Sequence, residues 1–204
     1  MTSISCDIVL LPSPELAQKA VNLSQQLSKF GSQFVLKDGE YFPHLSLYMV
    51  RLKIDDIKAV EDFLNKIAAT KSPECKLAAR RYYQSHGYID VEYRRTASLD
   101  DLQAKIIAKI NPLRDGLLDV DKTRLQAATG SIKENLERYG YVALAELFRP
   151  HMTFTRLNTN KLIAKDEFPS INHFDGPFTK LGLFELDGNN SCIRKIAECK
   201  LAGA

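Results

Sequence analysis

Two of the four histidines stand in matching short motifs whose residue types could perform acid–base chemistry on a phosphate ester. Residues 43–47 have the sequence PHLSL, and residues 150–154 have the sequence PHMTF. Imidazole titrates near neutrality, so one neutral histidine can accept a proton while a protonated one donates it. Serine and threonine hydroxyls can donate hydrogen bonds to phosphate oxygens. Two such motifs together therefore suit cleavage of a phosphodiester without a metal ion.

Each motif is expected at the start of a β-strand, where residues two apart point to the same face. His44 and Ser46 would then project together, and so would His151 and Thr153. The same alternation places Tyr48 beside Ser46, where its ring could stack on a nucleobase or pack within the wall. A pseudo-twofold axis would bring the two histidine–hydroxyl pairs face to face across a cleft.

Other kinds of site have weaker support in the sequence. Half-buried histidines bonded to backbone would explain one motif more readily than a matched pair. Neither motif has a neighbouring Asp, Glu or Cys to complete a ligand set, so we expect no metal site and no cofactor. No G-x-S-x-G elbow and no glycine-rich phosphate loop is present. The four cysteines form no C-x-x-C pair, which favours buried free thiols.

The elements that would carry the motifs occur in a repeated order along the chain. Apolar residues at spacings of three and four predict helices near residues 14–30, 57–67, 98–113 and 125–139. Alternating or apolar runs predict strands near residues 6–11, 42–50, 75–83, 88–93, 151–157, 178–186 and 192–201. The order helix, glycine, motif strand and β-hairpin occurs twice, which indicates an internal duplication.

We therefore predict an α+β fold with two antiparallel sheets, outer helices and a central cleft. Residues 1–204 would form one bilobal domain, with approximate lobes 1–95 and 96–204. The chain has 204 residues, 45% of them hydrophobic and 26% charged, which excludes disordered and coiled-coil classes. No apolar run approaches the roughly 20 residues of a membrane helix, and no secretory signal is visible. We expect a soluble, cytoplasmic monomer without membrane association; the net charge of +3 demands no polyanionic partner.

Paired H-x-(S/T) motifs about a hundred residues apart in a duplicated α+β frame resemble the 2H phosphoesterase superfamily. Its branches include 2′-5′ RNA ligases and 2′,3′-cyclic nucleotide phosphodiesterases. The resemblance covers nearly the whole chain, and the segment 148–156, FRPHMTFTR, is similar to the family's second motif. It implies that Arg156 contacts substrate, although strand parity points Arg156 away from the cleft unless the strand bends. Residues 118–139 form an insertion relative to small members, with no role assigned.

The resemblance implies hydrolysis of a 2′,3′-cyclic phosphate or a 2′-5′ phosphodiester in RNA ends or small nucleotides. By that analogy His151 is the base and His44 the acid, with Ser46 and Thr153 holding the phosphate. The near-symmetry of the motifs leaves the acid and base roles exchangeable. Two alternatives stay open: a nucleotide- or RNA-binding module without turnover, and a phosphodiesterase for a cyclic nucleotide metabolite outside RNA.

Overall fold

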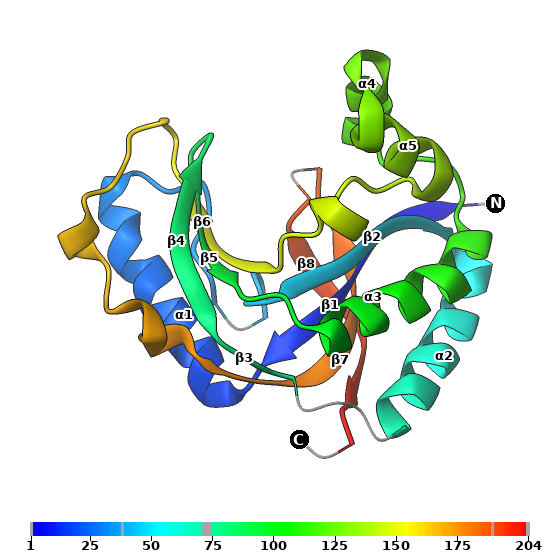
Figure 1. The fold of residues 1–204 in the computed structure, drawn as a ribbon, viewed down its shortest axis with the longest axis horizontal. Helices are drawn as coiled ribbons and strands as arrows, with labels where there is room; N and C mark the ends of the chain where they lie inside the picture. The colour runs from blue at the N-terminus through cyan, green and yellow to red at the C-terminus, as the bar shows by residue number, and fades with distance from the viewer. Residues whose placement is uncertain (1, 38, 71–74, 189, 203–204) are drawn as a thin grey trace.

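Two antiparallel sheets with helices on their outer faces form the protein (Figure 1). The computed structural model describes residues 2–37, 39–70, 75–188 and 190–202. The first sheet contains β2 (Leu45–Lys53), β1 (Ser3–Pro12), β7 (Gly176–Leu186) and β3 (Lys76–Leu77) in that order, and β8 (Cys192–Lys200) pairs with β7. The second contains β4 (Ala79–Ser85), β5 (Tyr88–Tyr93) and β6 (His151–Arg156). The predicted α+β class with two antiparallel sheets is confirmed.

Five α-helices lie in the described part of the chain. They are α1 (Pro14–Leu27), α2 (Ile57–Ala69), α3 (Ala97–Ile110), α4 (Asp119–Ala127) and α5 (Gly130–Tyr139). Short 3-10 turns occupy Ser28–Phe30, Ile54–Asp56, Asn111–Leu113, Ala145–Leu147, Lys165–Glu167 and Ile171–Phe174. α1 begins as its sequence predicts: Pro14 takes the first turn, and the Ser13 hydroxyl accepts the backbone N–H of Leu16 at 3.3 Å. Among the described residues, no helix is long and apolar enough to cross a membrane.

The insertion between the motifs contains two helices where the sequence predicts one. The pattern over residues 125–139 spans the end of α4 and all of α5, which are separated at Ala128 by extended backbone. Both helices project away from the two sheets (Figure 1). The second predicted hairpin turn, residues 187–190, includes residue 189, which lies outside the described residues.

The two sheets do not follow the two halves of the sequence. The hairpin β4–β5 belongs to the first half, yet it pairs with β6 of the second. The hairpin β7–β8 belongs to the second half, yet β7 pairs with β1. The lobes expected at 1–95 and 96–204 therefore do not correspond to the sheets, because hairpins are exchanged between the halves.

The repeat in the structure runs strand, helix, motif strand. It comprises β1–α1–β2 in one copy and β5–α3–β6 in the other, and in each copy the two strands pair antiparallel. The helices are crossed: α1 packs against β6, and α3 packs against β2. Figure 1 shows α1 on the outer side of the second sheet and α3 beside the first. Each motif strand is thus covered by the helix of the other copy.

Both motif strands carry a β-bulge directly after the motif hydroxyl. Opposite β1, Ser46 and Tyr48 are paired while Leu47 is the extra residue; opposite β5, the extra residue is Phe154. The crossed helices hydrogen-bond these two residues. The Ser24 hydroxyl of α1 donates to the Phe154 carbonyl at 2.6 Å, and Gln103 Nε2 of α3 donates to the Leu47 carbonyl at 2.9 Å. A bulge shifts the side-chain alternation beyond it.

Candidate active site

His44 and His151 are held in the same way. His44 Nδ1 lies 2.7 Å from the Phe42 carbonyl, and His151 Nδ1 lies 2.7 Å from the Arg149 carbonyl. A carbonyl oxygen only accepts, so Nδ1 carries the proton in both rings and Nε2 keeps its lone pair in the neutral form. The intervening prolines have a fixed φ, which helps to hold each carbonyl in place. Both rings are therefore set in one tautomer before any ligand arrives.

The two motif hydroxyls each donate to a buried carboxylate. Ser46 Oγ donates to Asp7 Oδ2 at 2.6 Å, and Thr153 Oγ1 donates to Asp90 Oδ1 at 2.9 Å. Asp7 is 0% exposed and Asp90 is 2% exposed. Their positions differ, because Asp90 lies directly opposite Thr153 whereas Asp7 lies opposite Met49, beyond the bulge. The hydroxyl–carboxylate pairing occurs twice, but from different register positions.

A cleft of about 510 Å³ has His44, Ser46, His151 and Thr153 on its walls. Ser46, His151 and Thr153 lie on strands of the two sheets and His44 directly precedes β2, so both sheets contribute to the cleft as the expected face-to-face arrangement requires. The volume lies in the range of small-molecule sites. Part of one wall is formed by α4 through Val120 and Arg124, so the insertion borders the site.

The surroundings of His151 are strongly charged. Arg149 Nη2 lies 2.7 Å from Asp90 Oδ2, and the Arg149 guanidinium lies 4.5 Å from the centre of the Tyr83 ring. Glu92 is 4% exposed and pairs with both Arg80 and Arg81 at 3.0 and 2.9 Å. Burial lowers the pKa of His151, while the Asp90 carboxylate acts against this and the Arg149 guanidinium adds to it.

The surroundings of His44 contain fewer charges. Burial lowers the pKa of His44 to about 4, opposed by its hydrogen bond to the Phe42 carbonyl. Burial also raises the pKa of Asp7 to about 7, and the Ser46 hydroxyl offsets part of that increase. Asp7 Oδ2 lies 3.7 Å from His44 Nε2, and Cys192 Sγ lies 3.6 Å from the same nitrogen. This side of the cleft therefore favours neutral groups.

Tyr48 does not face the cleft, contrary to the sequence-based expectation. The bulge at Leu47 reverses the alternation, so Tyr48 turns into the core and Met49 reaches the cleft wall. Tyr48 is 0% exposed, and the single proton of its hydroxyl is shared between the Tyr139 carbonyl at 2.7 Å and Asn111 Oδ1 at 3.0 Å. It holds the end of the insertion, at Tyr139, close to Asn111, rather than offering a ring to a base.

Arg156 is brought to the cleft side of its strand by the equivalent bulge at Phe154. Its guanidinium lies 4.8 Å from the centre of the Tyr88 ring, in a small recess that shares Tyr88 and Tyr41 with the main cleft. Arg156 Nε is buried without a hydrogen-bond partner. The strand thus has the bend that Arg156 requires to face the cleft. Contact between Arg156 and substrate stays a prediction.

Four further residues of the site were not identified from the sequence: Asp7, Asp90, Arg149 and Cys192. Two of them carry a signal, because Asp7 interrupts the apolar run of residues 6–11 and Asp90 lies between Ile89 and Val91. Arg149 directly precedes the second Pro-His pair. Cys192 had no local signal, since only the pairing of β8 with β7 brings it near His44. His86 also lies on the cleft wall.

Comparisons with known proteins show where this fold occurs. E. coli LigT in its apo form has a TM-score of 0.61 at 11% identity, covering 98% of this chain and 99% of LigT. LigT complexed with 3′-AMP has a TM-score of 0.59 at 14% identity, with the same coverage. The MHV ns2 PDE domain has a TM-score of 0.54 at 17% identity, covering 89% of this chain and 99% of that domain.

At these identities the likeness shows a shared fold. No curated protein sequence matches the chain. The family described as "Protein of unknown function (DUF1045)" matches residues 53–174, which include the second motif and the insertion. The chain thus belongs to the DUF1045 family, and it has the fold of the 2H phosphoesterases.

Proposed function

We propose that the protein is a metal-independent phosphodiesterase that hydrolyses 2′,3′-cyclic phosphates or 2′-5′ phosphodiesters in RNA ends or small nucleotides. The observation that carries the proposal is the pair of imidazoles fixed in one tautomer on the walls of one cleft. Each ring keeps Nε2 for proton transfer because Nδ1 is occupied by a carbonyl. A site that only binds a nucleotide has no need of two titratable groups fixed in this way.

The surroundings of the two rings favour His44 as the base and His151 as the acid. Burial lowers the pKa of both, but Asp90 and Glu92 act against this only at His151. His44 is thus the ring that stays neutral most readily. This proposal is the reverse of the assignment that the family resemblance implies, in which His151 is the base and His44 the acid. The near-symmetry of the motifs had left those two roles exchangeable.

In the proposed reaction, His44 Nε2 removes a proton from water as the water oxygen attacks phosphorus. The bond from phosphorus to the ribose oxygen breaks, and that oxygen takes a proton from His151 Nε2. The Ser46 and Thr153 hydroxyls, which donate to carboxylates in the free protein, turn to donate to phosphate oxygens. Arg149 stays paired with Asp90 when Thr153 turns away.

Several aromatic rings support a nucleotide as the substrate class. Tyr83, Tyr88 and Tyr141 line the cleft, where a base could stack between the phosphate site and solvent. The LigT structure with 3′-AMP shows that a protein of this fold binds a nucleotide. The Arg124 and Arg149 guanidiniums on the cleft walls add positive charge near a phosphate.

The test is a substrate panel assayed with excess chelator. It contains 2′,3′-cyclic mononucleotides, 2′-5′ oligoadenylates and ADP-ribose cyclic phosphate, with products resolved as 2′- or 3′-phosphates. We expect turnover of at least one nucleotide without added metal and its loss in His44→Ala and His151→Ala. Tight binding without turnover across the panel would favour the binding module. Turnover of ADP-ribose cyclic phosphate alone would favour a substrate outside RNA.

A further inference from the structure

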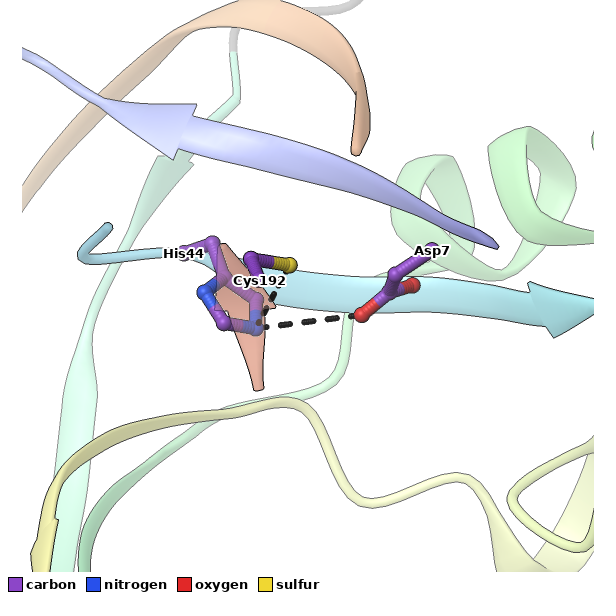
Figure 2. A group of neighbouring side chains, drawn as sticks. All are labelled: Asp7, His44 and Cys192. Carbon is purple, nitrogen blue, oxygen red and sulfur yellow. Dashed lines mark hydrogen bonds and ion pairs between the residues drawn. The ribbon is translucent and has the colours of Figure 1, made fainter. Parts of the chain in front are cut away.

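Asp7, His44 and Cys192 meet at one end of the cleft from three separate segments (Figure 2). Asp7 lies on β1, His44 directly precedes β2, and Cys192 is the first residue of β8. His44 Nε2 is 3.7 Å from Asp7 Oδ2 and 3.6 Å from Cys192 Sγ, and one ligand atom from each residue lies within 4.8 Å of the others. An imidazole nitrogen, a carboxylate oxygen and a sulfur thus surround one small volume.

These separations match a tetrahedral zinc site. Zinc holds nitrogen and oxygen at about 2.0–2.2 Å and sulfur at about 2.3 Å, which places N and O about 3.4 Å apart and N and S about 3.6 Å apart. The observed 3.7 and 3.6 Å from His44 Nε2 differ from these values by at most a few tenths of an ångström. The third separation, between the Asp7 carboxylate and Cys192 Sγ, is within 4.8 Å. A donor set of N, O and S suits Zn²⁺, whereas Mg²⁺ and Ca²⁺ prefer oxygen alone.

The groups around the three ligands are those that orient a metal site. The Nδ1 proton of His44 is held by the Phe42 carbonyl, which turns the Nε2 lone pair toward the cluster. The Ser46 hydroxyl donates to Asp7 and fixes that carboxylate. Asp7 is 0% exposed, and its Oδ1 has no hydrogen-bond partner. The oxygen nearest His44 Nε2 is instead Oδ2, which accepts from Ser46. A cation bound at Oδ2 would offset the cost of burying the charged carboxylate.

We propose that Asp7, His44 and Cys192 bind Zn²⁺, with the fourth coordination position open to the cleft, and that the bound ion inhibits the enzyme. Binding displaces the thiol proton of Cys192 to solvent, and Cys192 coordinates as a thiolate. The ion occupies His44 Nε2, the lone pair that would otherwise take the proton from water. Inhibition, though not binding, rests on the proposed function. Zinc here is a regulatory ligand rather than a cofactor of the reaction.

Binding is tested without any substrate. Co²⁺ is titrated into the metal-free protein and followed by its near-ultraviolet thiolate charge-transfer absorption, and Zn²⁺ is then added as a competitor. We expect one cobalt equivalent with the thiolate band, displaced by one zinc equivalent. Cys192→Ser should abolish the band, and Asp7→Asn should weaken zinc binding at least tenfold. Cys199→Ser, on the same strand, is the matched control and should keep the band. A band that is absent from the wild type, or that survives Cys192→Ser, overturns the site.

Inhibition is tested on whichever panel substrate is turned over. Each variant's rate with buffered free Zn²⁺ is divided by its own rate in chelator, so that differences in basal activity cancel. We expect the wild type and Cys199→Ser to be inhibited at the zinc concentration that displaces cobalt, and Cys192→Ser to need at least tenfold more. A rate that rises with zinc, or equal inhibition of both serine variants, overturns inhibition through this site. If no substrate is turned over, the proposed function fails while the cobalt result still decides the site.

Discussion

His44 and His151 share a backbone arrangement and differ in what surrounds it. Each ring places Nδ1 on the carbonyl two residues earlier, and each motif hydroxyl donates to a buried aspartate. Near His151, Asp90 pairs with Arg149, and the buried carboxylate of Glu92 pairs with Arg80 and Arg81. Around His44 the aspartate has a cysteine and the imidazole itself as neighbours.

This difference indicates how a duplicated site can acquire two roles. The repeat fixes geometry, because bulge, tautomer and hydroxyl recur in both copies. The neighbours then differ in their effect on the two rings: burial lowers the pKa of both, and nearby carboxylates oppose that lowering only at His151. Single substitutions around His44 and around His151 test whether the shared geometry and the differing charges contribute independently to activity and stability.

The largest effect is expected from removal of the imidazoles. His44→Ala and His151→Ala should each lower turnover by about 10²–10⁴, the usual contribution of a general acid or base. The double variant should lose less than the product of the two, because either proton-transfer partner is of little use alone. Steady-state rates on the best panel substrate measure this. Full turnover in both single variants would contradict the catalytic assignment.

The next effect concerns stability and pH. The pKa of Asp7 is raised by burial to about 7 in the folded protein, so between about pH 4 and 7 the folded state holds a proton that the unfolded chain has lost. The free energy of unfolding should therefore fall as pH rises through that window, by a few kcal/mol, relative to Asp7→Asn. Urea unfolding of both proteins in chelator at several pH values measures the difference. The exposed Asp101→Asn serves as control, and parallel curves for wild type and Asp7→Asn would refute the effect.

A smaller loss is expected for the hydroxyls. Ser46→Ala and Thr153→Ala should each remove one phosphate hydrogen bond, worth about 1.5–3 kcal/mol, or about 10- to 150-fold in kcat/KM. Thr153→Ser should restore most of the loss, because the hydroxyl returns. Binding of a nonhydrolysed nucleotide should persist in all three variants, since the cleft walls remain. If Thr153→Ser is as impaired as Thr153→Ala, the methyl group rather than the hydroxyl matters.

The smallest effect should come from the helix contacts to the bulges. Gln103→Leu leaves the Leu47 carbonyl without its donor, and Ser24→Ala does the same at Phe154. Each should lower the free energy of unfolding by about 1–3 kcal/mol. Because the helices are crossed, the variant in α3 should disturb the His44 side and the variant in α1 the His151 side. Chemical shifts of the two imidazoles report this, and perturbation of the wrong ring would contradict the crossed arrangement.

The sequence predicted the motifs, the strand that carries each and the fold class, because those depend on local pattern. The prediction that the Tyr48 side chain points toward the cleft was wrong. The side of the strand on which Arg156 lies depends on a bend that the sequence could not show. Both follow from bulges that depend on pairing with β1 and β5 and on the donors Ser24 and Gln103. Asp7 and Cys192 lie far from His44 in the chain, so only the tertiary structure brings them together.

The crossing of the helices also constrains how such a protein can change over evolution. Each copy of the repeat contributes the helix that holds the other copy's motif strand, so neither copy contains everything that its own strand needs. A protein consisting of one copy alone would have to dimerise to obtain the missing helix. Once the two copies are fused in one chain, they can no longer be inherited separately. New specificity would then arise at the rim, in the insertion of α4 and α5, because the spacing of the strands beneath it is shared between two interdependent halves.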